Sequence, residues 1–171
     1  MDKTIFKGRI FDVAQKTIRL PDGREAVRDM IIMNGAAAVL PILDDGRIAL
    51  VRQYRTGAQA DILELPAGML ETGEDPLVCA KRELKEETGY TAASVEFLLK
   101  YYSGAGFNTE MLYIYTATGL TPGETHFDGD EFLTTEIYGL NTALGMIDSG
   151  EIMDAKTIAA LLMYERRRGK L

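Results

Sequence analysis

The sequence predicts an α/β fold (in the broad α+β sense), with a mixed sheet packed between helices. Strand-like runs separated by short turns fill the chain before residue 75, where no helical period occurs. An Asp-Pro pair then opens a helix, and two further helices close the chain after more strands. A length of 171 residues suits one domain with a small appendage.

The appendage is predicted at the N-terminus. Three strands are expected there, at Thr4–Val13, Thr17–Leu20 and Ala26–Met33, and Pro21-Asp22-Gly23 has the residues of a tight turn between the last two. They indicate a small antiparallel β piece over residues 1–34, followed by the main domain over residues 35–171.

The main domain is predicted to begin with Ala36–Leu43 and Arg47–Tyr54, which are β-like runs joined by the hairpin signal Asp44-Asp45-Gly46. Ile62–Pro66 is a short strand that leads into a loop at Gly68. After the Asp-Pro helix we expect strands and then helices, in this order: Val95–Tyr102, Met111–Thr118, Glu131–Ile137, Thr142–Ser149 and Asp154–Arg168.

The most specific segment runs from Gly68 to Tyr90 and reads GMLETGEDPLVCAKRELKEETGY. It has a glycine, a glutamate after a five-residue gap, and then R-E-L-x-E-E-x-G. With random residues, such a match has odds on the order of one in a billion per starting point. Asp75 and Pro76 are helix-start residues, because Asp can cap free N–H groups and Pro fits the first helical position. Gly89 is a helix-stop residue.

The glutamates of this helix predict a metal site. At about 100° per residue, Glu83, Glu86 and Glu87 fall within an arc roughly 100° wide, beside the apolar stripe. Their mutual repulsion should cost a few tenths of a kcal/mol per pair, so a divalent cation such as Mg²⁺ or Mn²⁺ is expected to balance them. The alternative is a solvated acidic face balanced by neighbouring basic residues. The flanking glycines and Glu74 complete the pattern and favour metal binding.

The segment matches the Nudix box in full, so the chain resembles the Nudix hydrolases. The runs Val51-Arg52-Gln53-Tyr54-Arg55 and Glu64-Leu65-Pro66-Ala67-Gly68 resemble ADP-ribose pyrophosphatases and related nucleoside-diphosphate-sugar hydrolases. So do Arg28 before Gly35-Ala36-Ala37-Ala38-Val39, the acidic loop Asp128–Phe132, and Asp154-Ala155-Lys156-Thr157. The likeness spans about residues 5 to 167.

This resemblance implies an α/β/α sandwich and metal-dependent cleavage of a pyrophosphate bond. The favoured substrate is ADP-ribose, giving AMP and ribose 5-phosphate, and another nucleoside-diphosphate sugar such as GDP-mannose is the alternative. It also implies a homodimer through the N-terminal strands. One position departs from the subgroup: Ala105 stands where those enzymes usually have a proline, so specificity for ADP-ribose is open. A triphosphate hydrolase and a non-catalytic nucleotide-sugar sensor are the other hypotheses.

Roles for the box residues follow from this likeness and from charge. Glu83 and Glu87 are expected to be the principal metal ligands, with Glu86 either a ligand or a support for them. By resemblance, the carbonyl of Ala67 joins them, and more than one ion is expected per site. Arg82 is expected to pair with a box glutamate and orient it, and Glu74 could do similar work.

The general base and the substrate contacts are predicted outside the box. The candidates for the base are Asp128, Asp130 and Glu131, with Glu131 favoured; a solvated turn is the alternative interpretation of this loop. Arg28 and Arg55 are expected to bind the diphosphate or the terminal ribose, because guanidinium groups match phosphate oxygens; a structural role for either arginine is the alternative. Glu64 either binds ribose hydroxyls or pairs with an arginine. Phe107 and Tyr54 either stack on a base or belong to the core.

Composition narrows the class of protein. A net charge of −7 argues against a nucleic-acid partner, and no apolar run reaches the length of a membrane span. A single cysteine, Cys79, excludes an internal disulfide and suits a reducing compartment, so a cytoplasmic enzyme is expected. Cys79 is expected to be a small core residue and His126 to be incidental.

Overall fold

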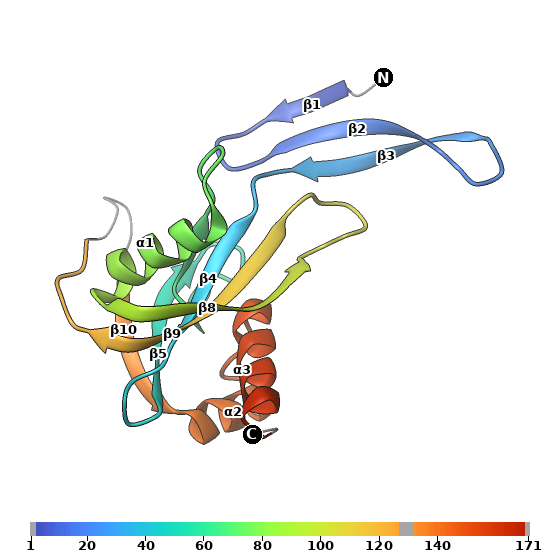
Figure 1. Cartoon of the computed structure of the whole chain (residues 1–171). Coiled ribbons are helices and arrows are strands. Elements are labelled where there is room, and N and C mark those ends of the chain that lie inside the picture. The colour runs from blue at the N-terminus through green and yellow to red at the C-terminus, as the bar shows by residue number, and fades with distance from the viewer. Residues whose placement is uncertain (1–2, 127–131, 170–171) are drawn as a thin grey trace.

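The computed structural model describes residues 3–126 and 132–169 (Figure 1). Its strands and helices follow the predicted order, with one additional short strand. They are β1 (Lys3–Lys7), β2 (Asp12–Arg19), β3 (Glu25–Ile32), β4 (Ala36–Pro41), β5 (Arg47–Arg55), β6 (Ala60–Glu64), β7 (Ala67–Met69), α1 (Pro76–Thr88), β8 (Thr91–Tyr102), β9 (Met111–Thr121), β10 (Leu133–Gly139), α2 (Leu140–Asp148) and α3 (Ala155–Arg168).

The body is a sandwich whose middle layer consists of two sheets, with strand orders β7-β4-β9-β8 and β10-β5-β6. Helix α1 lies on one side of this layer, and α2 and α3 lie on the other (Figure 1). Strand β4 shows why both faces are covered, since all of its residues are buried. Ala37 and Val39 pack with the α1 side, whereas Ala38 and Leu40 pack with α2 and α3. The predicted fold class is confirmed.

The first predicted strand, Thr4–Val13, is wrong because a turn divides it into β1 and β2. The N–H of Gly8 donates to the carbonyl oxygen of Phe11 at 3.1 Å and to Oδ1 of Asp12 at 3.3 Å. A Cβ at Gly8 would lie 2.5 Å from that carbonyl oxygen, so the turn needs glycine. The next strand therefore begins at Asp12, well before the expected Thr17.

The predicted hairpin at Asp44-Asp45-Gly46 is correct as a turn but wrong as a strand pairing. Gly46 has φ +82° and its N–H donates to the carbonyl of Leu43 at 2.8 Å. The strands then meet only at the isolated bridge between Ile42 and Ile48. Beyond the bridge they separate into different sheets, because β4 pairs in parallel with the distant β9.

The other differences concern element ends. The short strand expected at Ile62–Pro66 is β6, and β7 has no predicted counterpart. Strand β8 begins earlier than expected and β9 ends later, while β10 runs to Gly139. Helix α2 begins at Leu140 instead of Thr142, and Asp154 caps α3 from outside the helix.

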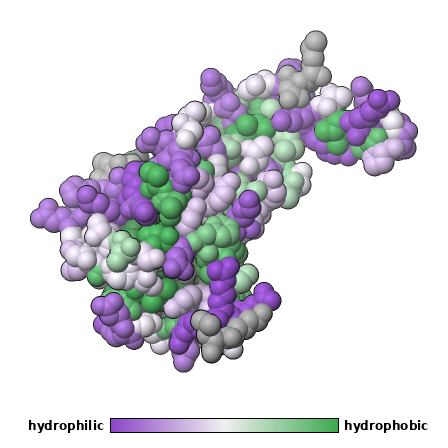
Figure 2. Space-filling view, in the orientation of Figure 1, coloured by the Kyte–Doolittle hydropathy of each residue, from purple (hydrophilic) through white to green (hydrophobic). Residues whose placement is uncertain are grey.

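Strands β1, β2 and β3 form a separate antiparallel sheet that projects from the body (Figure 1). Hydrophobic residues lie among hydrophilic ones on this arm (Figure 2). The sheet is tied to the loop between β8 and β9: the N–H of Ile31 donates to the carbonyl of Phe107 at 2.7 Å, and that of Thr109 donates to the carbonyl of Ile31 at 3.1 Å. Among the described residues, no helix is long and apolar enough to cross a membrane.

Candidate metal and active site

Helix α1 carries the site, and its ends form as the sequence predicts. Oδ1 of Asp75 accepts from the N–H of Leu77 at 2.8 Å, and Pro76 is the first helical residue. Gly89 ends the helix with φ +73°, and its N–H donates to the carbonyl of Lys85 at 2.9 Å. The buried face packs on β4, so the helix is held rigidly beside the loop that precedes it.

The loop and the helix meet at two glutamates. A Cβ on Gly68 would lie 1.8 Å from Oε1 of Glu83, so only glycine lets this carboxylate reach the loop backbone. Oε2 of Glu87 accepts from the N–H of Ala67 at 3.0 Å. Glu83 and Glu87 are 8% and 2% exposed. Two carboxylates with so little solvent around them need compensating positive charge.

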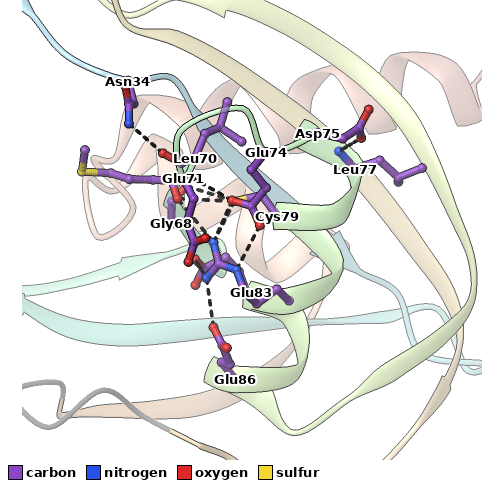
Figure 3. A network of polar contacts seen from close by, with 12 residues as sticks. Asn34, Gly68, Leu70, Glu71, Glu74, Asp75, Leu77, Cys79, Glu83 and Glu86 are labelled. Carbon is purple, nitrogen blue, oxygen red and sulfur yellow. Dashed lines mark hydrogen bonds and ion pairs between the residues drawn. The ribbon is translucent and has the colours of Figure 1, made fainter.

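Arg82 supplies part of that charge. Its Nε and Nη2 donate to the two carboxylate oxygens of Glu74 at 3.1 and 3.2 Å. Its Nη1 donates to Oε1 of Glu83 at 2.6 Å and to Oε2 of Glu86 at 3.1 Å. The hydrogen bond with Glu74 and the charge of Glu83 raise the pKa of Arg82, and the same bond lowers the pKa of Glu74. Figure 3 shows Glu74, Glu83 and Glu86 converging from the loop and the helix.

The oxygen atoms available at this site are the kind of ligand that binds a hard divalent cation. Glu83, Glu86, Glu87 and the carbonyl of Ala67 offer the oxygen ligands that Mg²⁺ and Mn²⁺ prefer. Within residues 3–126 and 132–169, no three acidic, histidine or cysteine side chains stand close enough together to hold an ion as they are oriented. The hydrogen bonds of Arg82 and of the Ala67 N–H account for that orientation of the carboxylates. The candidate bases Asp128, Asp130 and Glu131 lie outside the described residues.

Of the expected substrate residues, Arg55 and Glu64 are brought together and are joined by Nε to Oε1 at 2.5 Å. Glu64 is 2% exposed and also pairs with Lys156, which supports its interpretation as an arginine partner. Although burial opposes it, this pairing raises the pKa of Arg55.

The structure does not bring Arg28 to the box within one chain. It is exposed on β3, and its Nη1 donates to the carbonyl of Val27 at 3.0 Å. Phe107 and Tyr54 are 55% and 57% exposed, so neither is a core residue. Phe107 lies in the loop tied to β3, whereas Tyr54 lies on β5.

The expectation that Cys79 is a small core residue is confirmed, and the incidental role of His126 stays a prediction. Cys79 is fully buried, and burial raises the pKa of its thiol to about 12, so it stays protonated. His126 is exposed, and its backbone N–H donates to the carbonyl of Glu86 at 3.0 Å.

Lys156 and Asp154 adjoin Arg55 and Glu64, and neither has a predicted site role. Nζ of Lys156 contacts a carboxylate oxygen of Glu64 and lies 3.2 Å from Oδ2 of Asp154. The only available signal was the Asp154-Ala155-Lys156-Thr157 run, in which an Asp precedes a helix. That signal predicts a helix cap at Asp154, and it does not predict that Lys156 pairs with Glu64 on β6.

Comparison with known proteins agrees with this geometry. A family model described as "NUDIX domain" matches residues 33–161. The chain is 38% identical to an ADP-ribose pyrophosphatase of Bacillus subtilis, over 92% of this chain and 86% of that protein. It is 39% identical to a methanol dehydrogenase activator of Bacillus methanolicus over the same shares.

A crystal structure of an ADP compounds hydrolase superposes with a TM-score of 0.88 at 25% sequence identity, over 99% of this chain and 93% of that one. The family model covers most of the chain and includes the loop, the glutamate-bearing helix and the sheets that hold them. This protein therefore belongs to the NUDIX domain family.

Proposed function

We propose that this protein is a metal-dependent pyrophosphatase of nucleoside-diphosphate sugars, with ADP-ribose as its favoured substrate and AMP and ribose 5-phosphate as products. The observation that carries the proposal is the group of nearly buried carboxylates on α1, held against the Ala67–Gly68 backbone. The similarity to an ADP-ribose pyrophosphatase over most of both chains supports the choice of substrate.

Members of this family generally use divalent metal ions. In this chain Glu83, Glu86, Glu87 and the carbonyl of Ala67 would hold Mg²⁺ or Mn²⁺, with more than one ion per site. Bound ions of this kind make water more acidic and screen the diphosphate charge. Arg82 orients Glu83 and Glu86 through its hydrogen bonds, and Glu131 is our candidate for the group that takes the proton of the attacking water.

Arg55 and Arg28 would bind the substrate. Arg55 is fixed by Glu64, so its guanidinium is already oriented when the diphosphate arrives. Arg28 is on the projecting sheet, so we propose that it acts within a homodimer formed through β1, β2 and β3. Exposed apolar side chains on that sheet support such a contact: Ile5, Phe6, Ile18 and Val27. Given the single cysteine, we propose a reducing compartment, the cytoplasm.

The test compares hydrolysis of ADP-ribose, GDP-mannose, UDP-glucose and a nucleoside triphosphate, each with Mg²⁺ and with Mn²⁺. Products are separated by ion exchange, and a reaction in ¹⁸O-water shows which phosphorus receives the oxygen. We expect ADP-ribose to give the highest kcat/KM, with AMP and ribose 5-phosphate as products. Faster turnover of the triphosphate would replace this function with triphosphate hydrolysis. No turnover across the panel, together with micromolar binding of a nucleotide sugar, would indicate a sensor.

A further inference from the structure

A group of four charged residues from outside the box segment lies where the start of α3 meets the end of β6. Glu64 is at the end of β6, Arg55 is at the end of β5, and Asp154 and Lys156 flank the first residue of α3. The four charges sum to zero, and the Glu64 carboxylate at their centre is 2% exposed. These side chains also line a cavity of about 570 Å³, which is completed by Ala58, Ile62, Met153 and Ala155.

The carboxylate of Glu64 has a different cation on each oxygen. Oε1 accepts from Nε of Arg55 at 2.5 Å, and Oε2 accepts from Nζ of Lys156. Lys156 is held in turn by Asp154, whose Oδ2 lies 3.2 Å from Nζ and also caps α3 by accepting from the N–H of Thr157 at 2.9 Å. Lys156 is thus held by the residue that caps α3, and it occupies Oε2, the oxygen that Arg55 does not bind.

Arg55 consequently binds Glu64 through its Nε atom alone. Arginine and carboxylate groups tend to form two parallel hydrogen bonds, which here would engage Nε and a terminal nitrogen. Among the described residues, neither Nη1 nor Nη2 of Arg55 makes a hydrogen bond. The Arg55 side chain is 42% exposed and borders the cavity, so these donors remain available to an anion there.

We propose that Lys156 is a positioning residue that keeps the terminal nitrogens of Arg55 available to the substrate by occupying the second oxygen of Glu64. Without Lys156, Oε2 would be a buried acceptor with no partner, which is costly. Arg55 would then rotate to bond both oxygens through Nε and one terminal nitrogen, and would lose that terminal nitrogen as a donor to a diphosphate. This inference rests on the proposed function in assigning the diphosphate as the anion that Arg55 binds.

Kinetics of Lys156→Met test the inference. We expect KM for ADP-ribose to rise about tenfold while kcat falls less than about twofold, since uniform binding is what is lost. Lys156→Arg, which keeps a cation for Oε2, should keep KM within about twofold of wild type. Lys81→Met is the matched control, because Lys81 is exposed and no described residue is its partner, and it should leave both constants unchanged.

A second measurement separates positioning from a general structural effect. In an Arg55→Ala background, Lys156→Met should raise KM no further, because both changes remove the same contact. An additive increase, or a fall in kcat equal to the rise in KM, would overturn the inference. If Lys156→Met folds poorly, the same cycle is carried out with Lys156→Gln.

A crystal structure of the Lys156 variant without substrate tests the geometry independently of activity. Arg55 should make two hydrogen bonds with Glu64. If it keeps only the Nε bond, the positioning role is wrong, even when wild type hydrolyses ADP-ribose. If wild type hydrolyses no nucleotide sugar and the variant still shows the doubly bonded Arg55, the proposed function fails while the positioning of Arg55 stands.

Discussion

At the scale of single residues, the box contains residues that carry charge and residues that make room for it. Glu83, Glu86 and Glu87 carry the charge, and Arg82 sets the direction of two of them. Gly68 makes room, because any side chain there would occupy the position of the Glu83 carboxylate. The glycine in the sequence pattern is therefore explained by a side chain fifteen positions away on the helix, and not only by a turn.

Removing the charge of one candidate ligand tests the metal assignment. Glu86→Gln or Glu87→Gln should lower kcat by about a hundredfold or more, since an amide is a weaker ligand than a carboxylate. Circular dichroism should show an unchanged fold. Glu71→Gln is the control, because Glu71 is exposed on the loop outside the helix. Full activity of either ligand variant at the same metal concentration would contradict the assignment.

Gly68→Ala tests the space that this glycine leaves. The atom that the new Cβ meets is the end of the flexible Glu83 side chain, so we expect the carboxylate to move and the backbone to stay. The Mg²⁺ concentration for half-maximal activity should rise about tenfold or more. The melting temperature should change by only a few degrees. A large loss of stability with unchanged metal dependence would show that the backbone moves instead.

At the scale of elements, the sequence predicts helix ends and turns correctly, because they depend on nearby residues. It does not predict which distant strands pair. The bounds of α1 follow from Asp75, Pro76 and Gly89, which act on backbone groups within one turn. The pairing of β4 with β9 places Ala36 beside Leu112, and the residues next to either one carry no sequence signal for that pairing. A hairpin signal at residues 44–46 therefore predicted the turn and misassigned the partner.

The difference between local and distant contacts also explains which site residues could be predicted. The box carboxylates were found because one helix carries them, and their spacing alone puts them on one side. Lys156 was missed as a site residue because its partner, Glu64, is 92 residues away in sequence. The placement of Arg28 also depends on contacts that the box pattern does not contain.

The C-terminal end of α1 depends on the backbone conformation of Gly89 and on its close approach to Gly123, and a substitution can test both. Gly89 has φ +73°, and a Cβ there would lie 2.4 Å from the carbonyl oxygen of Gly123. Gly89→Ala should lower the free energy of unfolding by about 2–4 kcal/mol, because backbone strain and an unrelieved backbone contact add. Gly73→Ala is the matched control: it has φ +82° but open space around the new Cβ, so it should cost only about 1 kcal/mol. Equal losses in urea unfolding would mean that the Gly123 contact relaxes without cost.

At the scale of the whole molecule, the projecting sheet is the feature that a single chain does not explain. It exposes large apolar side chains, including Phe6 at 55% and Val27 at 56%, and holds Arg28 away from α1. In the homodimer that we propose, a second copy would cover these side chains and could bring an Arg28 to each site. That proposal makes activity depend on association as well as on folding.

Association can be tested by sedimentation velocity. Phe6→Asp combined with Val27→Asp should convert a dimer into a monomer, because two carboxylates would be buried without partners at the contact. Thr17→Asp, on an exposed position of β2 in the same sheet, is the control for added charge. A wild-type chain that sediments as a monomer at micromolar concentration would remove the proposed dimer.

Acid should destabilise the protein through its paired carboxylates. Hydrogen bonds from Arg82 lower the pKa of Glu74, and those from Arg52 lower the pKa of Glu136. A lowered pKa in the folded state contributes stability above the ordinary glutamate value of 4.5, and this contribution is lost as the pH falls through the folded pKa. Melting temperatures between pH 7 and pH 3 should therefore fall mainly below 4.5, and Glu74→Gln should flatten that part of the curve.

The contact between the first turn of α3 and the residue that follows β6 also bears on how the protein is synthesised. The N–H of Leu65 donates to Oγ1 of Thr157 at 2.8 Å, across 92 residues of sequence. The strand that leads to Ala67 is thus secured by residues near the C-terminus. During translation, this hydrogen bond can form only after the ribosome has passed Thr157, so we expect nascent chains that stop short of Thr157 to lack a finished catalytic centre.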